Sequence, residues 1–233
     1  MTVVTQEHAT DAMAESMASL YPFLYADSTD VDAVRAQVRQ STVDKAREII
    51  ELRREVQRRD SAKLVECAVA MAERFAAGGR LFVFGNGGSS TDAQDMATQF
   101  MNPPGNARPM PAFALTGDIA VVTALSNDVG FDVIFSRQVA AFGKPDDIAV
   151  GLSTSGNSAN LLRAFEEATR RGLLTVGIAG YSGGKMAEVE TMDYLFVVPS
   201  PSVHRIQEAQ TTIYHALCEL TAVALAGGRT DST

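Results

Sequence analysis

A glycine- and serine-rich segment, Gly85–Ser90, contains the residue types that bind anions in many proteins. Its sequence is Gly-Asn-Gly-Gly-Ser-Ser, and it lies between the apolar run Leu81–Phe84 and a helical pattern that begins near Ser89. Glycines let the backbone approach a ligand closely, and free N–H groups and the dipole at a helix start favour negative charge. The segment therefore predicts a cradle for a phosphate group, with a simple tight turn as the alternative.

A second segment, Ser153–Ser158, repeats this arrangement after an apolar run and before a helical pattern from Ala159. Its sequence, Ser-Thr-Ser-Gly-Asn-Ser, has four hydroxyl residues in six positions. A capped turn is the structural alternative, but one serine is enough to cap a helix and four exceed that need. We expect these hydroxyls and the backbone N–H groups to hold a phosphate monoester.

Strand and helix patterns alternate along the chain and place both segments at one edge of a predicted sheet. Apolar runs predict strands at 80–84, 112–115, 147–152, 174–179 and 194–198. The longest helical patterns are 30–59, as one helix or a pair, 61–77 as another helix, and 202–226. The alternation predicts an α/β protein with a doubly wound, five-stranded parallel sheet. Ligands bind outside the carboxyl ends of such strands, so the two segments can converge on one ligand.

The composition argues against several classes of protein. The chain has 233 residues, of which 46% are hydrophobic and 21% charged, as in soluble globular proteins. A net charge of -8 argues against a nucleic-acid groove. No apolar run is long enough to predict a membrane span, and the N-terminus lacks the pattern of a secretory signal. Cys67 and Cys218 are expected to be reduced, in a cytoplasmic protein.

Three stretches together resemble the SIS (sugar isomerase) domain, and within it the phosphoheptose isomerases: FGNGGSSTDAQ, GLSTSGNSANLLRA and RIQEAQTTIYHALCEL. The resemblance extends from about Lys45 to Leu225. Phosphoheptose isomerases convert sedoheptulose 7-phosphate to a heptose 7-phosphate. The resemblance implies a flavodoxin-like sheet and a homotetramer, in which N- and C-terminal helices form a bundle and the sites lie between subunits.

The resemblance also assigns roles to residues that match the family motifs. The positions that match phosphate contacts are Ser89, Ser153, Thr154, Ser155 and Ser158. The positions that match sugar contacts are Asn86 and Asp128, and Gly87 is expected to bind the substrate as well. On the C-terminal helix, Gln207 and His215 match polar site residues. They are eight positions apart, so with Thr211 they can share one helical stripe.

The chain departs from the family where the proton transfer takes place. Aldose–ketose isomerisation passes through an enediol and needs a base at carbon and an acid at oxygen. On the helix after the first segment the family has a histidine and, four residues later, the glutamate base; this chain has Asp95 and Gln99. An amide cannot accept a proton at neutral pH, so Gln99 cannot be the base. If the protein is an isomerase, the candidate catalytic residues are Asp95, Gln99 and His215, with Asp95 as a relocated base and His215 as the acid.

Zinc is the one cofactor that the resemblance suggests. Some members of the family bind it with four side chains, whose counterparts here are Asp95, Gln99, Gln207 and His215. Two amides beside one carboxylate and one imidazole make a poor zinc site.

Three functions remain open at this point. The first is an isomerase acting on sedoheptulose 7-phosphate or a related sugar phosphate, which we favour as a class. The second is a non-catalytic phosphosugar sensor, and the third is a protein-binding scaffold similar to the SIS protein that binds the bacterial replication initiator. The expected organisation is an extension at 1–30, a single SIS domain at 31–227 and a disordered tail at 228–233. The helix at 30–59 is expected to lie at an interface, because its narrow Val/Ile stripe needs a partner.

Overall fold

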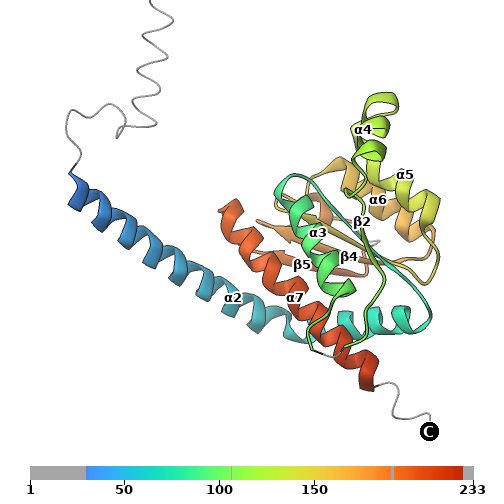
Figure 1. The fold of residues 1–233 in the computed structure, drawn as a ribbon, viewed down its shortest axis with the longest axis horizontal. Helices are drawn as coiled ribbons and strands as arrows, with labels where there is room; N and C mark the ends of the chain where they lie inside the picture. Colours follow the sequence, from blue (N-terminus) through green and yellow to red (C-terminus); the bar gives the residue numbers. More distant parts are fainter. Residues whose placement is uncertain (1–29, 106, 190–191, 228–233) are drawn as a thin grey trace, which may run out of the picture. The chain divides into compact units, whose positions relative to one another are not determined.

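The core of the protein is a parallel sheet of five strands (Figure 1). The computed structural model describes residues 30–105, 107–189 and 192–227. The strands are β1 Leu81–Gly85, β2 Ala112–Ala114, β3 Ile148–Ser153, β4 Leu174–Gly180 and β5 Tyr194–Val198. They lie in the order β2-β1-β3-β4-β5, and each neighbouring pair is parallel. This is the flavodoxin-like order of a doubly wound sheet.

The apolar runs form strands because helices cover both faces of the sheet. Every residue of β1, β3 and β4 is buried, so these strands need no alternation of polar and apolar residues. The edge strands β2 and β5 are only partly buried. The predicted α/β class and the five predicted strands are confirmed.

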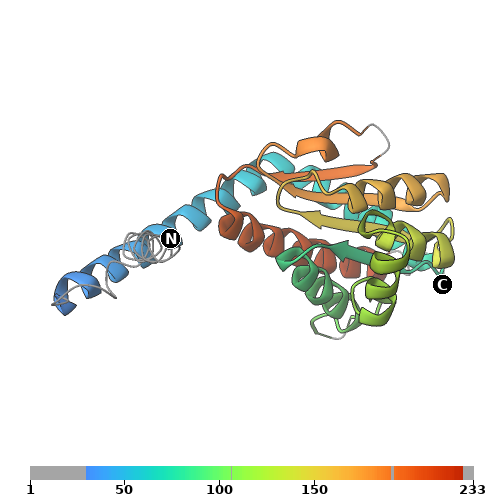
Figure 2. The same ribbon diagram turned by 90° about the horizontal axis from the view of Figure 1, so that it is seen from above.

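Helices lie on both faces of the sheet (Figures 1 and 2). The α-helices are α2 Val31–Ala76, α3 Gly88–Met101, α4 Ile119–Asp128, α5 Ile134–Phe142, α6 Ala159–Arg170 and α7 Val203–Gly227. Two short 3₁₀ helices are η2 Phe131–Val133 and η3 Gly184–Ala187. One apolar cluster joins α3, α7 and the part of α2 from Ile49 to one face of the sheet. A second cluster joins α5 and α6 to the other face.

The prediction of separate helices at 30–59 and 61–77 was wrong, because α2 is continuous from Val31 to Ala76. Asp60, at the expected break, is buried and accepts hydrogen bonds from Arg59 at 2.7 and 3.1 Å and from Lys63 at 3.4 Å. No glycine or proline interrupts this stretch, so the backbone hydrogen-bond ladder continues through it. A buried aspartate with cationic partners can therefore lie within a helix.

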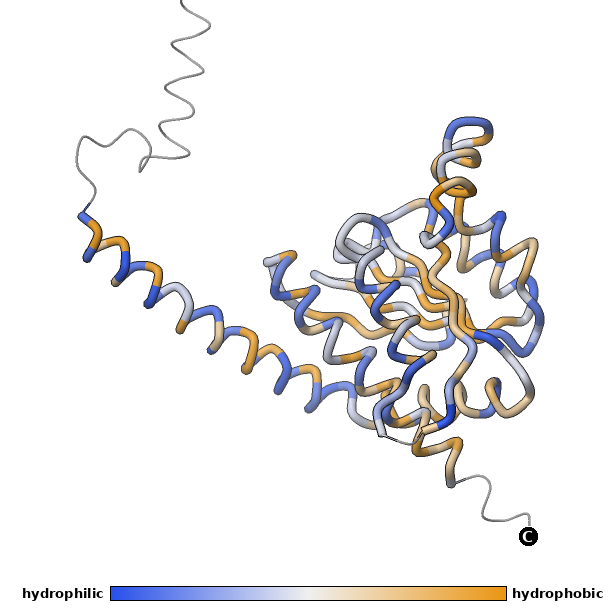
Figure 3. The backbone as a smooth tube through the Cα atoms, in the orientation of Figure 1, coloured by the Kyte–Doolittle hydropathy of each residue, from blue (hydrophilic) through white to orange (hydrophobic). Residues whose placement is uncertain are grey.

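The chain divides into two compact units, with the boundary between Arg47 and Glu48, inside α2. From Val31 to Arg47 every residue except Asp44 is exposed. Figure 3 shows apolar residues recurring among charged ones along α2. The expected extension at 1–30, apart from Asp30, and the expected tail at 228–233 lie outside the described residues, and the domain limits 31–227 stay a prediction. None of the helices in the described ranges is both long and apolar enough to cross a membrane.

Candidate active site

The two hydroxyl-rich loops lie next to each other at the carboxyl edge of the sheet. The first, Gly85–Ser90, leaves β1, and the second, Ser153–Ser158, leaves β3, which pairs with β1. The side-chain amides of Asn86 and Asn160 exchange two hydrogen bonds of 2.9 Å, one in each direction. Asn160 is in the first turn of α6, so these two hydrogen bonds connect the first loop to the helix that follows the second loop.

Neither helix that starts at these loops has a side-chain cap. Gly87 precedes α3 and Ser158 precedes α6, and neither makes a capping hydrogen bond through its side chain. Helix α4, in contrast, is capped by Asp118, whose carboxylate accepts hydrogen bonds from two backbone N–H groups. The hydroxyl of Ser158 instead lies 3.4 Å from that of Ser153. Ser158 therefore does not cap α6, whereas the hydroxyls of Ser153 and Ser155 accept hydrogen bonds of 3.0 and 3.2 Å from the backbone N–H groups of Gly156 and Asn157 within the loop.

Neighbouring elements hold the second loop in shape. Gly156 has a φ of +67°, and a Cβ there would lie 1.9 Å from the carbonyl oxygen of Gly183, so only glycine fits. From α7, the fully buried amide of Gln210 donates to the carbonyl oxygens of Ser153, at 3.3 Å, and Ile178, at 3.0 Å. This side chain bonds the carboxyl ends of β3 and β4 at the point where the loop begins.

Helix α7 also brings polar side chains against α3. Gln207 packs on the first residue of α3, since a Cβ on Gly88 would lie 2.1 Å from Nε2 of Gln207. Further along α7, the Tyr214 hydroxyl donates a 2.7 Å hydrogen bond to Oδ2 of Asp95. Nε2 of His215 lies 3.4 Å from the same oxygen. Folding thus joins a carboxylate, a phenol and an imidazole from two helices that are far apart in the sequence.

These neighbours hold the Asp95 carboxylate in its charged form. Burial raises the pKa of Asp95, but hydrogen bonds from Tyr214 and His215 outweigh it and leave the pKa below its usual value. Gln99, one turn further along α3, adds another hydrogen bond to the carboxylate. The pKa of Tyr214 is raised, chiefly by burial and also by its bond to Asp95, so the phenol stays a donor.

The other predicted contact residues differ in exposure. Ser89 and Ser153 are buried, whereas Thr154 and Ser155 are half-buried. Asp128, at the end of α4, is exposed, and its carboxylate accepts a 2.8 Å hydrogen bond from its neighbour Asn127. Among the residues that the structure describes, this bond ties Asp128 to its own helix rather than to either loop.

Comparison with known proteins identifies this arrangement. The sequence pattern of the SIS domain matches residues 46–180. The chain belongs to the SIS domain family. The phosphoheptose isomerase of Nitratidesulfovibrio vulgaris (strain DSM 19637 / Miyazaki F) is 42% identical over 184 residues, 78% of this chain and 88% of the relative. That of Solidesulfovibrio magneticus is 47% identical over 163 residues, 69% of this chain and 78% of the relative.

Solved structures agree with this assignment. The phosphoheptose isomerase GmhA from Neisseria gonorrhoeae aligns with a TM-score of 0.73 and 35% identity, covering 79% of this chain and 99% of that one. The phosphoheptose isomerase from Francisella tularensis aligns with a TM-score of 0.72 and 33% identity, covering 84% and 100%. The predicted resemblance to SIS domains of the phosphoheptose isomerase type is confirmed, and the family is one of sugar-phosphate isomerases.

The donor set of this SIS domain does not suit zinc. Asp95 and His215 supply one carboxylate and one imidazole, whereas Gln99 and Gln207 supply only amides. Zinc in proteins is held by Cys, His and carboxylate ligands, with at least three of them from the protein. Across the described part of the chain, no three His, Cys, Asp or Glu side chains gather in a group that could hold a metal ion. The chemistry of the site is therefore derived from its own side chains.

Three side chains of this SIS domain were not revealed by its sequence patterns. Asn160 belongs to the amide pair, Tyr214 is the donor to Asp95, and Asp92 lies one turn before Asp95. Asn160 comes two residues after Ser158, and Tyr214 immediately before His215, so proximity to motif residues was the available signal. Their partners come from distant segments, which a local pattern does not show.

Proposed function

We propose that this protein binds a phosphorylated sugar and interconverts its aldose and ketose forms, with sedoheptulose 7-phosphate or a related sugar phosphate as the substrate. The observation that carries the proposal is the contact between Asp95 of α3 and His215 of α7. These helices lie next to the two hydroxyl-rich loops, which the Asn86–Asn160 hydrogen bonds connect. Asp95 lies seven residues beyond Gly88, about 10 Å along the axis of α3. A phosphosugar with its phosphate at the loops can extend along α3 towards this pair.

The phosphate end of the substrate is assigned to the two loops. The uncapped starts of α3 and α6 favour negative charge, and the hydroxyls of Ser89, Thr154 and Ser155 add donors. Asn86 is bonded to Asn160, so we assign it to holding the loops in place as well as to contact with the sugar. The remaining sugar contacts are assigned to Gly87, Asp128 and Gln207.

The proton transfer is assigned to Asp95 and His215. Gln99, at the position of the family's glutamate base, cannot accept a proton, whereas Asp95 one turn earlier is a charged carboxylate. His215 is the acid partner, because its Nε2 lies within reach of Asp95. The low pKa of Asp95 makes it a weaker base than a glutamate in an apolar pocket, so we expect slow turnover.

Solvent-exchange NMR tests the catalytic part of the proposal. The protein is incubated with sedoheptulose 7-phosphate in D₂O, and deuterium is expected to enter at C1 and C2 as the enediol forms and collapses. Asp95→Asn keeps the size of the side chain and should abolish exchange while binding persists. Asp146→Asn, an exposed aspartate outside the site, is the matched control. Exchange that continues in Asp95→Asn would refute Asp95 as the base.

A binding measurement tests the phosphate assignment separately. Ser155→Ala removes one loop hydroxyl and should weaken phosphosugar binding by about 10- to 150-fold, since a hydrogen bond to a charged group contributes about 1.5–3 kcal/mol. Ser136→Ala is the control, because that hydroxyl bonds only the carbonyl of Val133 near its own helix. Titration calorimetry with equal affinities in both variants would contradict the assignment.

A non-catalytic role is the alternative, and the amide at Gln99 together with the hydrogen-bonded Asp95 favours it. In this case the protein is a phosphosugar sensor or a protein-binding SIS scaffold, similar to the one associated with the replication initiator. Absence of exchange, with thermal stabilisation by the sugar phosphate that is lost in Ser155→Ala, would indicate the sensor. Absence of both would favour the scaffold.

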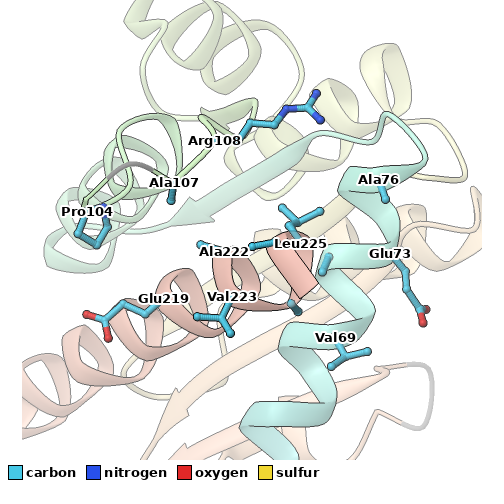
Figure 4. Close-up of a pocket in the computed structure, with 13 residues that line it drawn as sticks. Val69, Glu73, Ala76, Pro104, Ala107, Arg108, Glu219, Ala222, Val223 and Leu225 are labelled. Atoms are coloured by element: carbon cyan, nitrogen blue, oxygen red, sulfur yellow. The ribbon is translucent and has the colours of Figure 1, made fainter. Parts of the chain in front are cut away.

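We also propose that the protein forms a homo-oligomer, as a tetramer of the kind implied by the family resemblance. An apolar groove of about 1030 Å³ lies between α2, α7 and the segment after α3 (Figure 4). Val69 of α2 and Val223 of α7 line it and are 44% and 69% exposed. Figure 4 shows the charged ends of Glu73, Arg108 and Glu219 pointing away from its centre. A second copy of this chain would bury these valines.

Light scattering after size-exclusion chromatography tests the oligomer. The wild type is expected at four times the mass of the chain. Val223→Asp places a charge in the groove and should shift the protein to smaller species, whereas Val121→Asp, on exposed α4, should not. A monomeric wild type would refute the proposal.

A further inference from the structure

Asp92 is half-buried, and it differs from the fully buried aspartates of the described chain because one of its carboxylate oxygens has no partner. Asp60 and Asp147 are each 2% exposed, and each carboxylate is paired with an arginine at 2.7 or 2.8 Å. Oδ2 of Asp92 is buried and has no hydrogen-bond partner. An unsatisfied buried carboxylate oxygen costs free energy, so its presence calls for a functional explanation.

Asp92 is placed between the first loop and the Asp95–His215 contact. It lies in the second turn of α3, three residues before Asp95, so the two residues share a helix face and their backbone positions are about 4.5 Å apart along the axis. Tyr214 of α7 is affected electrostatically by both carboxylates. The pair therefore faces the part of α7 that carries the proposed acid.

The surroundings give the carboxyl groups of Asp92 and Asp95 different pKa values. Burial, followed by the charge of Asp95, raises the pKa of Asp92 to about 6. The pKa of Asp95 stays below its usual value, because hydrogen bonds outweigh the effect of burial. The ionisable groups that face Asp92 are Asp95 on its own helix and Tyr214 from α7. Two titratable groups whose environments separate them in this way are suited to act as acid and base.

We propose that Asp92 is a second catalytic carboxyl group. It donates protons to the oxygens of the sugar and accepts them back, while Asp95 moves a proton between C1 and C2. As Asp95 takes a proton from C1, the C–H electrons form the C1=C2 bond of the enediol. The C2 carbonyl oxygen meanwhile receives the proton of Asp92. Asp92 thus takes the role at oxygen that was assigned above to His215, and His215, whose Nε2 lies 3.4 Å from Oδ2 of Asp95, instead holds the base in position.

The second half of the reaction restores both groups. The Asp92 carboxylate takes the proton of the C1 hydroxyl as the new C1 carbonyl forms, and Asp95 returns its proton to C2. Atoms and electrons balance, and no oxidant or co-reactant is consumed. This role rests on the proposed isomerase function.

Steady-state kinetics with Asp92→Asn tests the role of Asp92. The amide has nearly the same shape but cannot exchange a proton. With sedoheptulose 7-phosphate, kcat should fall by about 100-fold or more, while the Kd of the sugar phosphate stays within about threefold. Asp146→Asn is the control for loss of one negative charge and should keep the kcat of the wild type. Asp92→Glu, which retains a carboxyl group, should recover part of the lost kcat.

The outcomes separate this role from the proposed function. If the wild type and Asp92→Asn are both active within tenfold of each other, only the role of Asp92 is refuted. Loss of kcat together with loss of binding, and no recovery in Asp92→Glu, would also refute it, because that pattern indicates a structural role. An inactive wild type that exchanges no deuterium would refute the proposed function and this role with it.

Discussion

The unpaired oxygen of Asp92 predicts that Asp92→Asn stabilises the protein at neutral pH. Oδ2 of the half-buried Asp92 has no partner, and burial together with the charge of Asp95 raises the pKa of Asp92 from 3.8 to about 6, so the fold favours the protonated form. A group with a raised pKa contributes stability below its unfolded pKa and loses that contribution as the pH rises through its folded pKa. Above pH 6 the wild type therefore carries a charge that its fold disfavours, and the asparagine variant does not.

The size of the effect follows from the shift in pKa. A shift of about two units corresponds to about 3 kcal/mol as an upper bound. Asp92 keeps part of its surface in solvent, and the buried amide of the variant also lacks a partner, so about 1–1.5 kcal/mol is expected after this discount. For a chain of this length the gain corresponds to a rise in Tm of about 2–6 °C.

Urea unfolding of the wild type and Asp92→Asn at pH 8, 6 and 4 measures this gain. The variant should be more stable at pH 8, and the difference should shrink towards pH 4, where folded Asp92 is protonated and the unfolded side chain is approaching its own pKa of 3.8. Asp95→Asn should show the opposite sign, because a lowered pKa contributes stability above the unfolded pKa. A variant that is less stable than the wild type at pH 8, or a gain that Asp146→Asn reproduces, would refute the reasoning.

Other substitutions test the supports of the site. Gly156→Ala forces a Cβ against the carbonyl of Gly183 at a φ of +67°, and urea unfolding should show a loss of about 2 kcal/mol or more; a loss under about 0.5 kcal/mol would contradict the geometry. Gln210→Met removes the amide that bonds the carboxyl ends of β3 and β4. It should cost about 1–3 kcal/mol and weaken phosphosugar binding in calorimetry, and unchanged affinity would count against this support. Tyr214→Phe removes a hydrogen bond to charged Asp95 and should cost about 1.5–3 kcal/mol at pH 7, with a smaller loss once the pH falls below the lowered pKa of Asp95 and the carboxylate is protonated; a loss that does not depend on pH would refute it.

Much of the architecture was predictable because its signals are local. An apolar run followed by glycines and serines indicates a strand, a turn and a helix start wherever it occurs, and parallel strands present their carboxyl ends at one edge. Both loops could therefore be assigned to one side of the sheet. The break expected at Asp60 was wrong because a charge pattern cannot show that distant packing will bury an aspartate with its own cationic neighbours.

The chain by itself determined the family, the sheet and the two hydroxyl-rich loops, since each depends on residue types at short spacing. It also determined that the family's base position holds an amide, Gln99. Only the tertiary structure decided which carboxylates lie close to α7. Asp95 and His215 are 120 positions apart, and their contact depends on how α3 packs against α7. The burial of the unpaired Oδ2 of Asp92 likewise exists only in the folded chain. The acidity of a carboxyl group is set by its neighbours in space, and those neighbours exist only in the folded chain.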